Sequence, residues 1–162
     1  LITERVSTLF DPQFASNRSR LLRWAQALLM FTEHPIIGNG YGAFAMLYQE
    51  DVALTGEYVA QFQLGVHSEY MQILAEQGSL GLIAWFWVIL AFFRFGVRAL
   101  RRIRDTFFRS LVLGIMAAEL SLLVHFLVNN LLNGDAIGIP FWVLYGLLPA
   151  VVGIAEREVK AT

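Results

Sequence analysis

The chain has 162 residues, of which 57% are hydrophobic and only 15% are charged, and its formal net charge is −1. Soluble domains average about a quarter charged residues, so this composition excludes an ordinary water-soluble protein and predicts membrane residence. Because the chain contains no cysteine, disulfides and thiolate metal sites are excluded as well.

The first residues show neither a basic segment nor an apolar core, so no signal peptide is predicted. Leu1 is not an initiator methionine. Together with the three apolar segments described below, this leads us to expect a fragment of a longer protein.

The first long helix is predicted over residues 18–32, with Ser16 or Asn17 as its N-cap. Apolar residues recur in it at helical spacing from Leu21 to Phe31. About 15 residues are too few to cross roughly 30 Å of hydrocarbon, so we expect a helix that lies along the membrane surface. It begins with three arginines: Arg18, Arg20 and Arg23.

Pro35 is expected to end this helix, and three alternating glycines follow between Gly38 and Gly42. A dinucleotide-binding loop would need a preceding strand in a βαβ unit, and the sequence predicts no strand here. We therefore favour a tight turn whose glycines adopt positive φ. Residues 43–66 are predicted to be an extramembrane loop with a helical piece near 43–48.

The segment from His67 to Gly81 predicts a short amphipathic helix that leads directly into a membrane span. Ser68 or His67 itself can cap this helix. Gly78 suits the left-handed position at a helix C-terminus. The pattern places an imidazole at a helix N-terminus and at the edge of the bilayer, which makes it the first candidate for chemistry.

Three apolar stretches are long enough to span a bilayer. Between Arg94 and Arg109 the sequence holds six arginines and one acid, so the positive-inside rule places this region in the cytoplasm. The fold class predicted is an all-α integral membrane protein that forms part of a larger polytopic bundle. Its expected parts are a periplasmic loop with amphipathic helices at 1–78, transmembrane helices at 79–97, 110–128 and 137–155, a basic cytoplasmic loop at 98–109, a periplasmic turn at 129–136 and a cytoplasmic tail at 156–162.

His67 has two interpretations. It can be a helix-start histidine bonded to backbone or to a lipid headgroup, or a general base that the helix N-terminus keeps neutral near pH 7. Glu69 can orient the ring or act as a second acid–base group. A metal set of His67, Glu69 and His34 fits no standard spacing, so no metal is expected.

Other polar residues also leave alternatives open. The three arginines form either a basic face for anionic headgroups or a diphosphate clamp, because guanidinium forks grip phosphate oxygens bidentately. Glu119, inside the second span, is either a hydrogen-bonding acid within a helix bundle or part of a polar cavity. His125 and Asn129 lie one turn apart near the outer end of that span, and we favour a structural role for them.

Three segments in this order resemble the C-terminal half of the bacterial O-antigen ligases and O-antigen polymerases. The segment Arg20–Leu28 is similar to the family's arginine-x-x-x-tryptophan helix, and His34–Phe44 is similar to its proline–glycine turn. The segment His67–Gly81 looks like the histidine helix that enters the following span. Ser68 departs from the asparagine common at that position, so ligase and polymerase stay unresolved.

The resemblance implies a polytopic, mostly helical glycosyltransferase of the bacterial inner membrane whose large periplasmic loop covers the active site. Such enzymes move a glycan from undecaprenyl diphosphate to the hydroxyl of a glycan or lipid acceptor, without cofactor, metal or nucleotide sugar. By this resemblance Arg20 holds the diphosphate and His67 activates the acceptor. We add Arg23, Arg18 and Glu69 as candidate substrate-binding residues. Membrane lipids are expected partners, and nucleic acid is not. The resemblance also implies an N-terminal transmembrane half that is missing here, so the isolated fragment is expected to be inactive.

Two alternatives stay open. A protein O-oligosaccharyltransferase shares this architecture and differs in its acceptor. A non-catalytic scaffold would tolerate the loss of His67 and Arg20, whereas an enzyme would not. A transporter segment would show paired spans broken by glycine or proline at the midplane, whereas the breaks here cluster outside the predicted spans.

Overall fold

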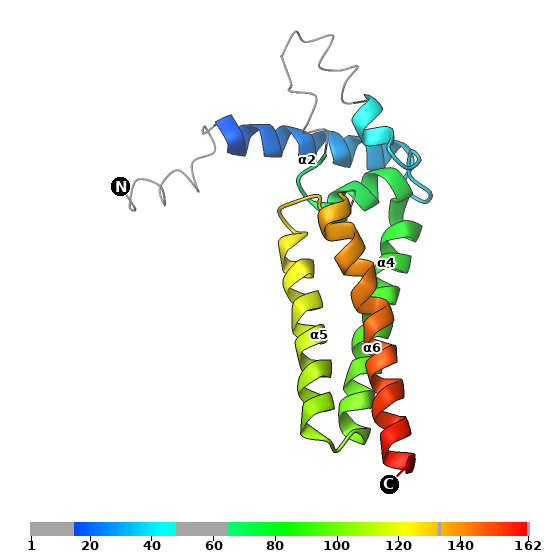
Figure 1. Ribbon diagram of the computed structural model, residues 1–162. Coiled ribbons are helices and arrows are strands. Elements are labelled where there is room, and N and C mark those ends of the chain that lie inside the picture. Colours follow the sequence, from blue (N-terminus) through cyan, green and yellow to red (C-terminus); the bar gives the residue numbers. More distant parts are fainter. Residues whose placement is uncertain (1–14, 48–64, 133, 162) are drawn as a thin grey trace, which may run out of the picture. The chain divides into compact units, whose positions relative to one another are not determined.

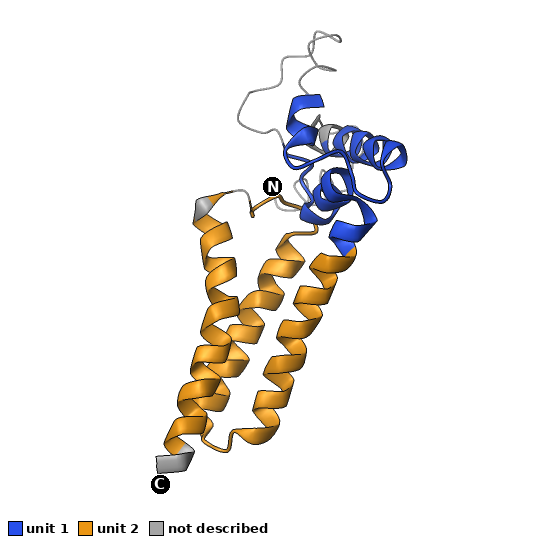
Figure 2. Ribbon diagram, turned by 90° about the vertical axis from the view of Figure 1, so that its right-hand side faces the viewer, with its two compact units in different colours: residues 1–82 blue, residues 83–162 orange. Residues whose placement is uncertain are grey.

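The computed structural model describes residues 15–47, 65–132 and 134–161. These ranges contain no strand, and their long helices are α2 (Ala15–Glu33), α4 (Glu69–Arg102), α5 (Thr106–His125) and α6 (Asp135–Ala161) (Figure 1). The chain divides into two compact units, unit 1 with residues 1–82 and unit 2 with residues 83–162 (Figure 2). In the described ranges α4, α5 and α6 are long and apolar enough to cross a membrane. The predicted class, an all-α integral membrane protein, is confirmed.

In unit 1, α2 is an amphipathic helix. One face is buried and carries Arg23, Ala27 and Met30 at helical spacing. The other face exposes four leucines: Leu21, Leu22, Leu28 and Leu29. The helix begins at Ala15, so the predicted caps at Ser16 and Asn17 are wrong, because these residues lie inside the helix. Adding a turn to an existing helix costs little compared with nucleating one, so two weak cap residues do not stop it.

The first part of α4 ends at a sharp kink. Gly78 has φ 66° and ψ −165°, a non-helical conformation. The positive φ agrees with the prediction of a glycine that ends a helix, but ψ lies outside the left-handed helical region, in one that is essentially restricted to glycine. Such a kink leaves backbone groups of the helical ladder without partners inside the helix. The Ser79 N–H donates to the Pro35 carbonyl at 2.9 Å, and the Leu80 N–H donates to the Ile36 carbonyl at 3.1 Å. The turn after α2 therefore accepts the hydrogen bonds that the kinked helix cannot make.

The same turn also satisfies carbonyls of α4 on the other side of the kink. The Asn39 N–H donates to the Ala75 carbonyl at 3.2 Å, and the Gly40 N–H donates to the Glu76 carbonyl at 2.8 Å. Positive φ angles are present at Gly38 (71°), Gly40 (102°) and Gly42 (79°), as the interpretation of a tight turn requires. Residues 35–42 therefore hold the first part of α4 through backbone hydrogen bonds, and we call this segment the glycine bracket.

We expect Gly78→Ala to destabilise unit 1 strongly. A Cβ at Gly78 would lie 2.5 Å from the Ile36 carbonyl oxygen and 2.6 Å from the Gly38 nitrogen. The φ/ψ region itself costs a non-glycine residue about 1–3 kcal/mol before any clash is counted. The matched control is Gly114→Ala in α5, where a Cβ meets nothing within 4 Å. Thermal unfolding of the two purified variants compares them, and equal melting temperatures would contradict the bracket.

The connection between α4 and α5 is shorter than predicted. Residues 98–109 were expected as a loop, but α4 continues to Arg102 and α5 begins at Thr106. The Asp105 carboxylate accepts the Phe108 N–H at 3.1 Å and so caps the start of α5. The Arg109 guanidinium donates to the carbonyls of Leu100 and, at 3.1 Å, Ile103. Because both helix ends have side-chain partners, only three residues are needed for the turn.

Unit 2 is built from the remainder of α4 with α5 and α6 (Figure 2). Trp85 of α4 stacks on Phe141 of α6 with ring centroids 5.3 Å apart, and Phe92 lies 4.6 Å from Tyr145. Large apolar side chains also cover the outside of the unit, among them Trp87 at 69% exposure. This pattern is typical of helices that lipid surrounds. The core cluster consists of Phe92, Ala99, Ile103, Val112, Ile115, Leu148, Val151, Val152 and Ala155.

Candidate functional site

The candidate site lies in unit 1, where three segments far apart in the sequence share one apolar cluster. α2 contributes Ala27 and Met30, the short helical segment at 43–47 contributes Phe44, and α4 contributes Ala75. Val66, next to His67, is fully buried in the same cluster. Burial of Val66 fixes the backbone immediately before the histidine, so the position of His67 follows from packing of the core.

His67 has a strained backbone. Its φ is 58°, and no other non-glycine residue in the described ranges has a positive φ. This conformation is uncommon for residues with a Cβ, although histidine tolerates it better than most, and such outliers cluster at functional sites. Ser68 follows at the N-cap position, and its carbonyl accepts the Gln72 N–H at 3.0 Å as α4 begins at Glu69. Ser68 therefore occupies the N-cap position, which the sequence predicts for Ser68 or His67.

The surroundings of His67 favour a neutral imidazole. Burial lowers the pKa of His67 from its ordinary value of 6.5, and the positive charges of Arg23 and then Arg20 lower it further. The sequence also predicts a neutral His67 ring near pH 7, but it attributes this to the helix N-terminus. Since a base must be unprotonated to accept a proton, His67 is available as a base at pH 7.

The two arginines beside His67 differ in their environments. Arg23 is 5% exposed, and its Nη1 donates to the Gly65 carbonyl at 2.9 Å. Arg20, one turn earlier on α2, is partly exposed. The structure thus brings Arg20, Arg23 and His67 together, and among the arginines Arg20 is the more accessible. The side chain of Arg18 lies outside the described part of the chain.

Glu69 and His34, which the sequence also singles out, differ in their exposure to solvent. Glu69 is the first residue of α4 and is 4% exposed, so it is buried among protein atoms. His34 follows α2 and is exposed. Within the described ranges no group of three or more histidines and carboxylates is placed to hold a metal ion.

Two polar residues that support the site were not recognised from the sequence. The Asn39 side chain donates to the Met30 carbonyl at 2.8 Å and to the Ala75 carbonyl at 3.0 Å, which joins α2 to α4. The Glu76 carboxylate is buried and accepts the Phe44 N–H at 3.4 Å. It also accepts the Gln72 side-chain N–H at 3.2 Å. The only sequence signals are an asparagine between two glycines and a Gln–Glu pair four residues apart.

A family model described as O-antigen ligase matches residues 2–86, more than half of the chain. The chain belongs to the O-antigen ligase family. Its matched region contains α2, the glycine bracket and the segment that begins at His67, which are the parts that form the candidate site. No curated protein and no solved structure matches the chain.

Membership in the O-antigen ligase family indicates a ligase activity of the glycosyltransferase type, and the spans make the chain part of a multi-pass membrane protein. Two groups of polar residues lie in unit 2, beyond the match. Glu119 of α5 is fully buried. The Asn129 side-chain nitrogen lies 2.9 Å from His125 Nε2, which is the local contact that a structural role requires.

Proposed function

We propose that this chain carries the acceptor-activating part of a glycosyltransferase that moves a glycan from undecaprenyl diphosphate to an acceptor hydroxyl, as an O-antigen ligase or polymerase. The observation that carries the proposal is that Arg20 lies close enough to His67 for its charge to lower the pKa of the ring, in the region that matches the family. A cation for a diphosphate and a base for a hydroxyl are the two groups that this reaction needs.

Arg20 has the chemistry to hold the diphosphate of the donor. Its guanidinium is always charged and can place two parallel N–H groups on phosphate oxygens. Undecaprenyl diphosphate leaves with additional negative charge on its oxygens, so a fixed cation beside them stabilises the transition state more than the bound donor. The partial exposure of Arg20 leaves its fork accessible to a ligand.

His67 takes the proton of the acceptor. In the proposed step the acceptor oxygen forms a bond to the anomeric carbon, while the bond from that carbon to the diphosphate oxygen breaks. The electron pair leaves with undecaprenyl diphosphate, and the hydroxyl proton passes to the His67 ring. The lowered pKa of His67 keeps the ring ready to accept it at neutral pH. The step uses no cofactor, metal or nucleotide sugar.

A donor anchored in the bilayer requires a site at the membrane surface. α4 carries its apolar span directly after the Gly78 kink, only eleven residues after His67 in the sequence. The exposed leucines of α2 suit a helix that contacts lipid. We therefore place unit 1 on the periplasmic face of the inner membrane, with the arginine-rich turn in the cytoplasm.

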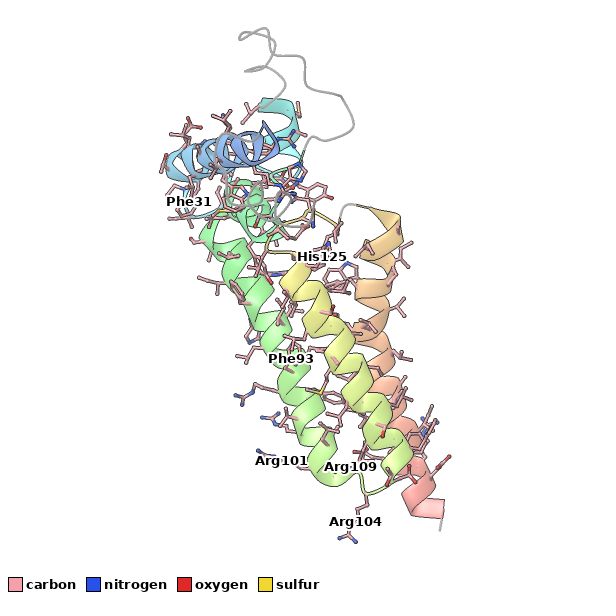
Figure 3. All side chains as sticks on the ribbon, turned by 90° about the vertical axis from the view of Figure 1, so that its left-hand side faces the viewer. Phe31, Phe93, Arg101, Arg104, Arg109 and His125 are labelled. Atoms are coloured by element: carbon pink, nitrogen blue, oxygen red, sulfur yellow. The ribbon has the colours of Figure 1, made fainter. Side chains whose placement is uncertain are left out.

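The charges of unit 2 support this orientation. Arg101, Arg104 and Arg109 lie at one end of its helices, and His125 lies at the other end (Figure 3). Positive charge concentrated at one end is typical of the cytoplasmic side.

Cysteine labelling tests this topology, because the chain has no cysteine of its own. We expect a membrane-impermeant maleimide applied from the periplasm to label Met46→Cys, which replaces a side chain that is 71% exposed in unit 1. Thr106→Cys, which replaces an exposed residue at the start of α5, is expected to react only after the membrane is permeabilised. The reverse pattern would overturn the orientation.

Transfer by purified full-length protein in liposomes tests the function itself. Given undecaprenyl diphosphate-linked glycan and a glycan or lipid acceptor, without nucleotide sugar, the protein is expected to glycosylate the acceptor and release one undecaprenyl diphosphate for each transfer. Transfer only to serine or threonine of a polypeptide would identify a protein O-oligosaccharyltransferase. No transfer to any acceptor by folded protein would favour a scaffold.

A further inference from the structure

Arg23 does not present its guanidinium in the way that a ligand-binding arginine does. It is 5% exposed, and its Nη1 already donates to the Gly65 carbonyl at 2.9 Å. This bond joins residues 42 positions apart in the sequence, from the middle of α2 to the backbone two residues before His67. A buried charge is costly unless it is hydrogen-bonded. The bond to the Gly65 carbonyl offsets part of this cost, and it forms only when α2 and the segment before His67 are arranged as they are here.

The backbone around His67 is held from both sides. Before it, Arg23 bonds the Gly65 carbonyl, and Val66 is fully buried in the apolar cluster. After it, Ser68 is buried, and its carbonyl accepts the Gln72 N–H at the start of α4. A positive φ at a non-glycine residue costs about 1–3 kcal/mol and persists only when the surrounding structure determines it. The φ of 58° at His67 therefore depends on these contacts, and among them only the Arg23 bond is made by a charged side chain of another helix.

We propose that Arg23 is a positioning residue for His67, which fixes the histidine backbone through Gly65 and is not part of the diphosphate clamp. This inference rests on the proposed function, in which His67 is the base. It gives different roles to two arginines that the sequence groups in one candidate diphosphate clamp. Arg20 contacts the donor, and Arg23 holds the segment that carries the base. General-base catalysis depends on placement, since a misplacement of about 1 Å can cost about 100-fold in rate.

Arg23 has a second effect on the same histidine. Its positive charge lowers the pKa of His67, more than that of Arg20 does. Among the residues that the structure describes, the charged groups that shift the pKa of His67 are these two arginines of α2. Glu69 is the acidic residue on its own segment. Removal of the charge at position 23 leaves Arg20 as the cation and raises the pKa of His67, so a larger fraction of the ring is protonated at a given acidic pH.

The variants Arg23→Gln and Arg23→Lys separate these effects from donor binding. In full-length protein, Arg23→Gln is expected to lower the single-turnover transfer rate about 10- to 100-fold, while the donor Kd stays at the wild-type value. The acid limb of its rate–pH profile is expected to move to higher pH. Arg23→Lys keeps the charge and one donor for the Gly65 carbonyl, so it restores the pH profile and most of the rate. Arg104→Gln, at an exposed position of unit 2, is the control and changes neither quantity.

Thiol labelling tests the hydrogen bond between Arg23 and the Gly65 carbonyl without an activity assay. Val66→Cys places a thiol at a fully buried position in a chain that otherwise has no cysteine, and a maleimide is expected to react with it slowly. Combined with Arg23→Gln the thiol is expected to react at least about tenfold faster, because local opening of a segment follows the loss of its tertiary contacts. Combined with Arg23→Lys it is expected to stay protected. This readout stands even if the wild-type protein transfers no glycan.

Three results would overturn the inference. One is a rise in donor Kd for Arg23→Gln equal to that for Arg20→Ala, which would return Arg23 to the diphosphate site. Another is an unchanged labelling rate at Val66→Cys together with a normal transfer rate. The third is a pH profile of Arg23→Gln that shifts in the acidic direction. If Arg23→Gln does not fold, then Arg23→Lys must still protect the thiol and keep the wild-type pH profile.

Discussion

Replacement of Arg20 by alanine in the full-length protein is expected to abolish measurable glycan transfer. The loss combines weaker donor binding with the loss of charge stabilisation in the transition state, and removal of one such stabilising donor costs about 10²–10³ in rate. Arg20→Lys is expected to restore transfer poorly, because a point charge cannot replace a fork that binds two phosphate oxygens. The measurement is the initial rate of transfer from undecaprenyl diphosphate-linked glycan by purified variants.

The neighbouring arginines supply the controls for this prediction. Arg18→Ala is expected to have a smaller effect than Arg20→Ala, because the resemblance assigns the diphosphate to Arg20. Arg23→Gln is expected to slow transfer through His67 while donor binding stays intact. Equal, mild losses for all three positions would contradict a diphosphate site at Arg20 and indicate a general basic surface that meets anionic headgroups.

Replacement of His67 is the second large effect. His67→Ala is expected to lower the transfer rate by about 10²–10⁴-fold, the usual contribution of a positioned general base. The positive φ of 58° requires a matched control, since alanine at this conformation adds backbone strain. Asparagine tolerates the left-handed region but does not act as a base near pH 7, so His67→Asn keeps the backbone and removes only the chemistry. Both variants are expected to fold and to bind the donor.

The wild-type enzyme is expected to lose activity as the pH falls through the pKa of His67. Because burial and two arginines lower this pKa from its ordinary value of 6.5, less than half of the His67 rings are protonated at pH 6.5. The acid limb of the rate–pH profile therefore lies below 6.5, and in His67→Asn this limb is absent from the residual activity. An acid limb well above 6.5 would contradict a neutral histidine held beside two cations.

The sequence predicted the elements of this fold better than the contacts that join them. Hydrophobic runs of sufficient length mark α4, α5 and α6, and Pro35 and Gly78 mark ends and kinks, because these signals depend on local backbone geometry. The loop between α4 and α5 is shorter than its charges predict. Residues 98–109 read as a loop by charge, but Asp105 and Arg109 cap the adjoining helices and shorten it.

The sequence indicates which residues are candidates for the site, but it does not indicate the long-range contacts that hold them. Arg20 and His67 stand out by residue type and by the resemblance, and Arg20 lies close enough to His67 for its charge to lower the pKa of the ring. The role of Arg23 could not be read, since its partner is a backbone carbonyl 42 residues away and no side-chain pattern reports such a bond. Glu76 reads as part of a polar helix face, yet it is buried and accepts the Phe44 N–H, because the glycine bracket covers that face.

In the proposed reaction Arg20 binds the donor diphosphate and His67 accepts the acceptor proton, and one paired measurement tests these separate roles most directly. Donor Kd and single-turnover transfer rate are measured on the same preparations of wild type, Arg20→Ala and His67→Asn, with undecaprenyl diphosphate-linked glycan in liposomes. Arg20→Ala is expected to raise the donor Kd about 10- to 100-fold, the equivalent of a lost charge-assisted pair. His67→Asn is expected to keep the wild-type Kd and to lose at least about 100-fold in rate. Transfer by His67→Asn at the wild-type rate, or a loss of donor binding in it as large as that in Arg20→Ala, would contradict the account.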